Sequence, residues 1–276
     1  MSKLTISIVT PTLRRPNEVE GMVKNICRQQ YLPSEIILVD GAPNHETQTQ
    51  SVVKKINKNL PFNILYIRKT GGTAVQRNSG IEAAKGKLIC FIDDDIRLEN
   101  DFFKIILSYF QDSIYSDVGG IVGYRTNETI CPKNHRRWIW YKRLGIYKSF
   151  EPGRYDYQTG YPINANLQSP FRGAKEVDFM TTACAVWRRE VMDNGLRFDK
   201  FFKDYGILED AHFSLRAGER WKLLQVGDAR CIHLRSEKAR EDPFLVASKT
   251  AINYRYLFID IIKNRTFMQE IRFWRV

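Results

Sequence analysis

The sequence predicts an α/β protein with a mostly parallel, Rossmann-like sheet flanked by helices. Short apolar runs alternate with segments of helical periodicity over residues 1–125, which is the rhythm of βαβ units. The run 87–93 is apolar almost throughout, as expected for a parallel strand covered on both faces. Hydrophobic residues make up 43% of the 276 residues, which is enough for a full core and excludes a disordered chain.

The elements of this half follow in order along the chain. Strands are expected over the β-rich runs 4–9, 35–40, 62–68 and 87–93. Helices are expected over 17–29, 46–57, 73–84 and 99–110, the first with Asn17 as its N-cap. Ligands on such sheets bind at the carboxyl ends of the strands, so the residues there are candidates for a site. They are Thr10-Pro11-Thr12, Asp40 and Asp93-Asp94-Asp95.

The alternation stops after the glycine-rich run 118–124. Residues 126–172 interleave eight lysines and arginines with tryptophans and tyrosines, and we expect an insertion or long functional loop there. Beyond it the pattern predicts a strand over 176–180, a helix over 209–220, an apolar run over 221–226, a helix over 243–262 and a basic aromatic tail. We expect a single domain over 1–240, with halves 1–125 and 126–240, followed by a C-terminal helix and tail over 241–276.

Composition excludes several classes of protein. No apolar run approaches the roughly 18 residues of a membrane span, and residues 1–9 lack the pattern of a signal peptide. The five cysteines are scattered without C-x-x-C spacing, which argues against structural zinc and indicates reduced thiols. We therefore expect a cytoplasmic protein. The net charge of +12 favours polyanionic partners without choosing among nucleic acid, anionic lipid and phosphorylated substrates.

The triple aspartate 93–95 is the strongest local signal for chemistry. Adjacent carboxylates repel one another and raise one another's pKa, which a bound cation relieves. Oxygen ligands suit Mg²⁺ or Mn²⁺, which one or two carboxylates and substrate phosphates commonly hold. The alternative is a solvated acidic turn that caps the following helix.

Other polar residues carry weaker signals, each with a plainer alternative. Asp40 is placed to contact a nucleotide base or ribose, and the alternative is an ordinary Asp-Gly turn. Glu209-Asp210 at a predicted helix start suits a general base, or helix capping. His233 suits a metal site shared with Asp95, or a structural role.

Gly71-Gly72 opens the segment GGTAVQRNSG, which has neither P-loop nor G-x-G-x-x-G spacing. This argues against a P-loop NTPase and against an ordinary Rossmann dehydrogenase. Arg77 in the following helix has the reach to contact a diphosphate, the alternative being a surface salt bridge.

Taken in order, these segments resemble the inverting glycosyltransferases of family 2, which have the GT-A fold. The resemblance covers roughly residues 4–125 and 175–240. It rests on SIVTPTLRR (7–15), EIILVDGAP (35–43), GGTAVQRNSGIEAAKGKLICFIDDD (71–95), YGILEDAHFSLRAGERWKLL (205–224) and IHLRSEKAR (232–240).

The resemblance implies a role for each matching residue. It implies that the donor nucleotide is bound by Thr10, Pro11, Arg14, Asp40, Arg77, Asp93 and Asp94. The family's D-x-D motif falls on 93–95, so Asp95 would hold Mn²⁺ or Mg²⁺, with His233 near the metal. Asp210 would be the catalytic base and Glu209 would support it.

The implied reaction transfers a sugar from a nucleoside-diphosphate sugar, UDP-sugar first, to a hydroxyl of a glycan or lipid-linked acceptor, with inversion. A non-catalytic binder of nucleic acid or anionic surfaces is an alternative from another class, although no nucleic-acid signature is visible and we expect no nucleic-acid partner. A sugar nucleotidyltransferase is an enzyme alternative, but SIVTPTLRR lacks the glycine-rich G-x-G-T-R-L segment of that class.

The basic aromatic residues of 126–172 and of 272–275 predict a peripheral contact with an anionic membrane. Tryptophan and tyrosine favour the membrane–water interface, and lysine and arginine are attracted to anionic lipid. We expect this face to meet the acceptor at the inner membrane surface, the alternative being a solvated acceptor loop whose aromatic rings stack on sugar.

Overall fold

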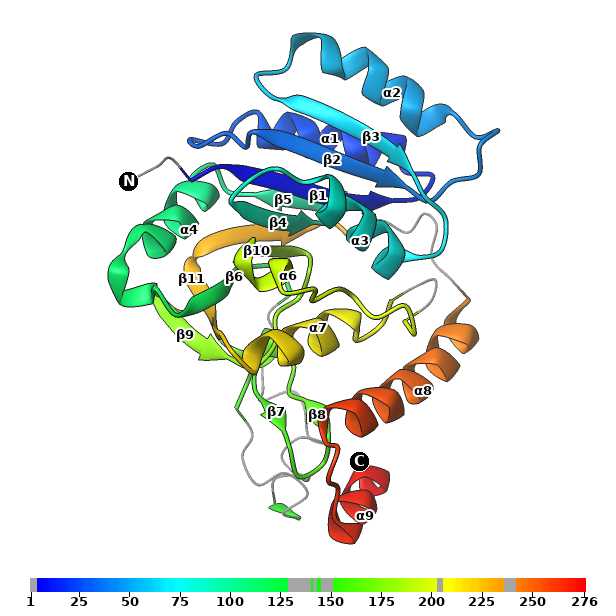
Figure 1. Ribbon diagram of the computed structural model, residues 1–276, viewed down its shortest axis with the longest axis vertical. Helices are drawn as coiled ribbons and strands as arrows, with labels where there is room; N and C mark the ends of the chain where they lie inside the picture. The colour runs from blue at the N-terminus through cyan, green and yellow to red at the C-terminus, as the bar shows by residue number, and fades with distance from the viewer. Residues whose placement is uncertain (1–3, 129–139, 141–142, 145–150, 203–205, 236–241) are drawn as a thin grey trace.

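The computed structural model describes residues 4–128, 140, 143–144, 151–202, 206–235 and 242–276. Its centre is a nine-stranded sheet in which eight strands follow the order β3-β2-β1-β4-β10-β6-β11-β5 and β9 pairs with β11 (Figure 1). These strands are β1 Ile6–Thr12, β2 Glu35–Asp40, β3 Asn63–Arg68, β4 Leu88–Ile92, β5 Ile96–Leu98, β6 Val118–Arg125, β9 Ala174–Val177, β10 Cys184–Arg188 and β11 Lys222–His233.

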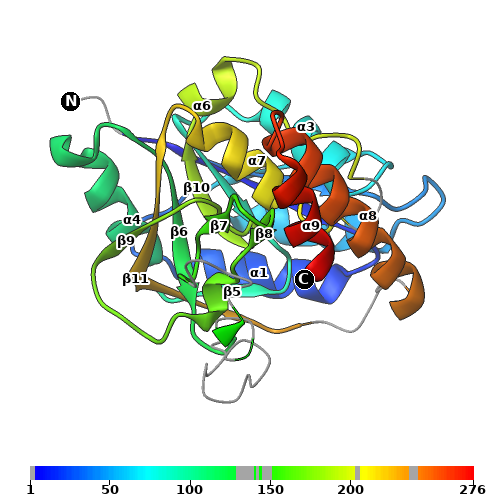
Figure 2. The same cartoon turned by 90° about the horizontal axis from the view of Figure 1, so that it is seen from below.

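Helices cover both faces of the sheet. Figure 2 shows α1 on one face and α3, α6 and α7 on the other. The α-helices are α1 Pro16–Ile26, α2 Gln48–Ile56, α3 Thr73–Ala83, α4 Phe102–Gln111, α6 Glu190–Asp193, α7 Glu209–Gly218, α8 Pro243–Ile261 and α9 Phe267–Arg275. A separate hairpin pairs β7 Tyr155–Asp156 with β8 Tyr161–Pro162. Among the described residues, no helix combines the length and hydropathy needed to cross a membrane.

The predicted α/β sheet flanked by helices is confirmed, and its pairing is mixed. Strands β3, β2, β1 and β4 run parallel, as the βαβ rhythm predicts. Strand β10 then pairs antiparallel with both β4 and β6, and β11 pairs antiparallel with β5 and β9. The first half of the sheet thus brings the carboxyl ends of β1, β2 and β4 to one edge, where the candidate residues lie.

Besides shifts of two or three residues at other element ends, such as the strand predicted over 176–180 that is β9 at Ala174–Val177, three local predictions differ from the structure. Asn17 is not an N-cap, because α1 begins one residue earlier at Pro16, whose missing N–H and fixed φ suit the first helical position. The helix expected from residue 99 begins at Phe102, because 96–98 form the edge strand β5. The basic aromatic tail forms α9, which a capping box at Thr266 and Gln269 starts.

Helix α8 packs beside α7, and α9 packs on α8. Leu257 of α8 is fully buried with Leu215 of α7, and His212 Nε2 lies 2.9 Å from Asp260 Oδ2. The ring of Phe273 in α9 stacks on Phe258 of α8 at 4.6 Å between centroids. These contacts attach both helices to the part of the sheet that carries α7 (Figures 1 and 2).

Helix α3 approaches β1 closely at Gly80. A Cβ atom at this position would overlap the side chain of Val9, which is fully buried. The gain in helix propensity from Gly80→Ala is about 1 kcal/mol, and overpacking in a filled core costs about 1–3 kcal/mol. Glycine is therefore required here by the spacing between helix and sheet.

We expect Gly80→Ala to lower the free energy of unfolding by up to about 2 kcal/mol in urea denaturation, because the cost of overpacking outweighs alanine's higher helix propensity. Gly218→Ala is the matched control, since a Cβ there meets nothing within 4 Å. The control should leave stability unchanged or raise it. Equal effects of the two substitutions would contradict the close approach of α3 to β1.

Candidate functional site

A cavity of about 530 Å³ opens at the edge where the parallel strands end. It lies between the carboxyl ends of β1 and β4 and the starts of α3 and α7. Arg125 and His233, the last residues of β6 and β11, complete its wall. Its lining includes Pro11, Thr12, Arg15, Arg77, Asp93, Asp94, Asp95, Arg125, Thr181, Thr182, Glu209, Asp210 and His233.

The acidic turn after β4 is held by groups from the chain itself. Thr12 Oγ1 donates a 2.6 Å hydrogen bond to Asp94, and Arg15 Nη1 lies 3.0 Å from Asp94 and 3.5 Å from Asp95. Burial raises the pKa of Asp94 to about 7, although Arg15 and the Thr12 hydroxyl act in the opposite direction. The turn is therefore buried and cation-paired, and the alternative of a solvated acidic turn does not describe it.

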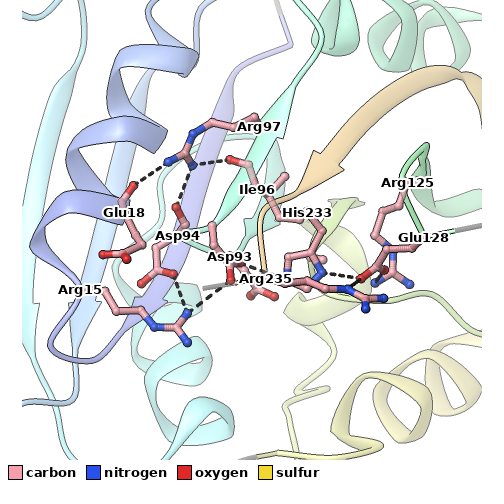
Figure 3. A network of polar contacts seen from close by, with 12 residues as sticks. Arg15, Glu18, Asp93, Asp94, Ile96, Arg97, Arg125, Glu128, His233 and Arg235 are labelled. Carbon is pink, nitrogen blue, oxygen red and sulfur yellow. Dashed lines mark hydrogen bonds and ion pairs between the residues drawn. The ribbon is translucent and has the colours of Figure 1, made fainter. Parts of the chain in front are cut away.

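His233 links the acidic turn to a second carboxylate. Its Nε2 lies 3.2 Å from Asp95 Oδ1. Its Nδ1 lies 2.8 Å from Glu128 Oε1 (Figure 3). Hydrogen bonds to Asp95 and Glu128 raise the pKa of His233 to about 9. Burial would raise the pKa of Glu128, but the hydrogen bond from His233 and the charge of Arg125 lower it to about 2.

Arg77 joins the two sides of the cavity from α3. Its guanidinium donates to Glu209 at the start of α7 and lies 3.1 Å from Asp93 after β4. The Arg77 and Glu209 side chains are almost completely buried. The alternative of a surface salt bridge for Arg77 is therefore wrong, because the ion pair forms part of the cavity wall.

Asp210 follows Glu209 and also faces the cavity. Its Oδ1 accepts a 2.8 Å hydrogen bond from the Ala211 amide. Burial raises its pKa above the ordinary value, against that hydrogen bond and the charge of Arg77. The N-cap position of α7 is Leu208, at a left-handed φ of 69° and with no side-chain cap.

Three of the predicted nucleotide-binding residues do not line the described cavity. Thr10 is fully buried within β1, and the exposed Arg14 pairs with Glu46 at 2.6 Å. Asp40 is fully buried at the end of β2, where it accepts hydrogen bonds from the Tyr66 hydroxyl at 2.7 Å and the Ala42 amide at 2.9 Å. Their roles toward a nucleotide stay predictions.

The sequence reasoning missed Arg15, Glu128 and Arg125. Arg15 stands next to Arg14 in SIVTPTLRR. The backbone at Arg14 is left-handed, with a φ of 56°, and this conformation decides which of the two arginines faces the acidic turn. Glu128 lies just after β6, and only the pairing of β6 with β11 brings it to His233. No local spacing would have found either contact.

The residues present fit a divalent cation held by two protein ligands. Asp95 Oδ1 and His233 Nε2 face one another at the cavity wall, and Mg²⁺ or Mn²⁺ commonly takes its remaining ligands from substrate phosphates and water. Within the described part of the chain, no cluster of three or more His, Cys, Asp or Glu side chains has the arrangement to hold a metal ion. A cation here would therefore depend on ligands from a donor.

Comparison with known proteins gives the family. The sequence model described as glycosyl transferase family 2 matches residues 7–196. The chain belongs to this family. The chain is 33% identical over 154 residues to the uncharacterized glycosyltransferase YwdF of Bacillus subtilis. The aligned residues cover 54% of this chain and 56% of YwdF.

A second relative of this family 2 chain is the poly(ribitol-phosphate) beta-N-acetylglucosaminyltransferase TarP of Staphylococcus aureus. It is 22% identical over 130 residues, covering 46% of this chain and 39% of TarP. The chain thus spans about half the length or less of these curated relatives.

Solved structures agree on the fold. The mannosyltransferase PcManGT of Pyrobaculum calidifontis, in complex with GDP-Man and Mn²⁺, superposes with a TM-score of 0.64 at 15% identity, over 96% of this chain and 66% of PcManGT. Residues 1–349 of S. aureus TarS with UDP superpose with a TM-score of 0.59 at 16% identity, over 98% and 68% of the two chains. The predictions of family 2 membership and of a GT-A-type α/β fold are confirmed.

We expect the His233 contacts to make stability pH-dependent in metal-free protein. The ordinary histidine pKa is about 6.5 and the folded pKa is about 9, so the folded state binds this proton more tightly. The stabilisation is complete below pH 6.5 and is lost as the pH rises through 9. Its size is at most about 3 kcal/mol.

The measurement is urea unfolding in EDTA near pH 6 and near pH 9.5. The wild-type protein should lose more stability between the two than His233→Gln does. His45→Gln is the control, since its ring is 81% exposed. Identical losses in all three proteins would show that His233 does not carry the shifted pKa.

Proposed function

We propose that the protein is a metal-dependent inverting glycosyltransferase in polysaccharide or glycoconjugate synthesis. It moves a sugar from a nucleoside-diphosphate sugar, UDP-sugar first, to a hydroxyl of a glycan or lipid-linked acceptor. One observation carries the proposal: Asp93, Asp95 and Asp210, from segments more than 100 residues apart, line one cavity together with Arg77 and His233. In this proposal residues 1–125 form the donor-binding half and 126–240 the acceptor-side half.

The charges of the wall support a diphosphate donor. Arg15, Arg77 and Arg125 line the same cavity as the acidic turn. Guanidinium groups bind phosphate oxygens through paired hydrogen bonds, and they stabilise the charge that grows on a leaving diphosphate. Structural neighbours have been solved with ligands of this class, TarS with UDP and with UDP-GlcNAc and PcManGT with GDP-Man.

Asp95 and His233 are the residues that would hold Mn²⁺ or Mg²⁺ in this site. When bound, the ion neutralises negative charge on the diphosphate leaving group. Arg15 and protonated His233 pair with Asp95 in the metal-free protein, so an ion held by Asp95 and His233 would have to displace the proton from His233 Nε2. The solved PcManGT complex contains Mn²⁺ together with its nucleotide sugar.

Asp210 is the proposed base. Burial raises its pKa, which makes the carboxylate a stronger proton acceptor than an exposed aspartate, while its place in the first turn of α7 keeps it ionised. It takes the proton from the acceptor hydroxyl, whose oxygen attacks the anomeric carbon opposite the leaving group. The configuration inverts, and no covalent enzyme intermediate is needed. Glu209, fixed by Arg77, holds the start of α7 in place.

Thermal-shift screening against nucleotide sugars, with and without Mn²⁺, would identify the donor. Ligands that bind only the folded state raise its apparent stability by mass action. One nucleotide sugar should raise the melting temperature more than the others, and more with Mn²⁺ than with EDTA. No shift with any nucleotide sugar would contradict the proposed function.

Asp95→Ala should abolish Mn²⁺-dependent binding of the donor in calorimetry, because it removes the carboxylate proposed to hold the ion. The variant should stay folded at the temperature of the titration, although loss of the Asp95 contacts to Arg15 and His233 lowers its stability. Asp117→Ala is the control, since Asp117 is exposed, pairs with Lys222 and lies outside the cavity. Unchanged metal-dependent affinity in Asp95→Ala would make the metal assignment wrong.

Asp210→Asn keeps size and hydrogen bonding but removes the basic oxygen. Turnover should fall at least about 100-fold while donor affinity stays near wild type. Asp193→Asn, on the exposed side of α6, is the matched control and should retain full turnover. If Asp210→Asn turned over at the wild-type rate, another group would have to be the base.

A further inference from the structure

Helix α8 leaves four large apolar side chains exposed on one side. Phe244, Leu245, Ile252 and Ile259 are all exposed, Phe244 to 80%. At 3.6 residues per turn they fall within an arc of about 100° on one side of the helix. Leu257 is buried on the opposite side of the helix and Phe258 on its flank, so α8 has a core side and a second, uncovered side that carries these apolar residues.

Helix α9 also exposes large apolar side chains, placed beside those of α8. Phe267 is 80% and Trp274 is 72% exposed, whereas Phe273 is buried. Arg255 of α8 pairs with Glu270 of α9 at 2.6 Å, and its guanidinium lies 5.5 Å from the centre of the Trp274 ring. The two groups of exposed side chains therefore meet at Arg255. We call the exposed residues Phe244, Leu245, Ile252, Ile259, Phe267 and Trp274 the α8–α9 face.

The surroundings of the α8–α9 face are basic. Residues 242–276 contain six lysines and arginines against three acidic residues. Each acid is already occupied within the chain. Asp242 accepts hydrogen bonds from amides at the start of α8, Asp260 contacts His212 and Arg216, and Glu270 pairs with Arg255 and Arg265. The exposed Lys263 and Arg275 add positive charge to a chain of net charge +12.

Helix α8 is also attached to the wall of the cavity. Asn253 Nδ2 donates a 2.8 Å hydrogen bond to the carbonyl of Ile207, which lies between the cavity residues Gly206 and Glu209. The Tyr256 hydroxyl donates a 2.6 Å hydrogen bond to Asp199. A surface that lies against α8 is therefore held beside the segment that carries Asp210.

We propose that the α8–α9 face lies on an anionic lipid bilayer. Exposed apolar side chains grouped on two adjacent helices mark an interaction surface, and the combination of Phe and Trp with Lys and Arg is typical of surfaces that lie in the membrane interface. The uncompensated positive charge selects anionic lipid over neutral lipid and over a second copy of this basic chain. Resting on the proposed function, the same placement brings a lipid-linked acceptor to the side of the cavity that carries Asp210.

The test is co-sedimentation of the full chain with vesicles of phosphatidylcholine alone and of phosphatidylcholine mixed with phosphatidylglycerol, at low and at physiological salt. The apolar variant is Phe244→Gln/Ile252→Gln/Phe267→Gln, and its control is Ile114→Gln, an equally exposed apolar residue outside the face. The charge variant is Lys263→Gln/Arg275→Gln. Its control is Lys58→Gln/Lys104→Gln, two exposed lysines on other elements.

Wild type should bind the anionic vesicles at least about tenfold more strongly than the neutral ones, and less as salt rises. The apolar variant should lose at least about tenfold in partitioning, and the charge variant should lose several-fold with a weaker salt dependence, while both controls bind as wild type. Equal binding to both vesicle types, or an apolar variant that binds as wild type, would overturn the proposal.

Two further measurements separate membrane binding from self-association and from donor binding. A wild-type dimer in sedimentation equilibrium that the apolar variant abolishes, without vesicle binding, would overturn the proposal in favour of an interface between copies. Calorimetry of sugar-nucleotide binding in solution reports the proposed function independently. Vesicle binding without any donor binding would refute the proposed function and support membrane binding by the α8–α9 face. Donor binding without vesicle binding would support the proposed function and refute membrane binding by this face.

Discussion

The buried bridge from Arg77 to Glu209 and Asp93 is the contact on which the rest of the site depends. Arg77 belongs to α3, Asp93 follows β4, and Glu209 begins α7, so one guanidinium connects segments that are 16 and 132 residues away in the sequence. Removing one member of a buried ion pair leaves an uncompensated charge and costs about 3–5 kcal/mol. The bridge therefore fixes where α7 starts, and with it the direction of the neighbouring Asp210.

The cavity wall balances its charges with groups of its own. Arg15 contacts Asp94 and Asp95, His233 contacts Asp95 and Glu128, and Arg77 contacts Asp93. These carboxylates are buried or partly buried, and burial disfavours their charged forms. The cations offset that cost in the absence of any ligand. In the proposed function, a donor and its cation would exchange these internal pairs for new ones, and binding would rearrange the ion pairs of the wall.

Features set by local sequence could be predicted, and features set by distant pairing could not. The predicted strand 35–40 has the bounds of β2, because an apolar run between turn residues is a local signal. The acidic turn 93–95, Arg77, Glu209, Asp210 and His233 were all found from their place at predicted strand and helix ends. The contact of Glu128 with His233 depends on β11 lying beside β6, and the antiparallel insertion of β10 between β4 and β6 depends on a return of the chain after about 60 residues. Neither leaves a periodic signal in the sequence.

Gly80 has a consequence beyond the packing of α3. It lies three residues after Arg77 on the same helix, and its missing side chain sets the distance from the helix axis to β1. An arginine side chain has a limited length. The distance from α3 to β1 therefore determines whether the Arg77 guanidinium can contact both Asp93 and Glu209. The absence of a side chain at Gly80 thus helps to place Arg77 within reach of both carboxylates. The packing of α3 on β1 and the position of Arg77 in the cavity wall therefore depend on the same distance.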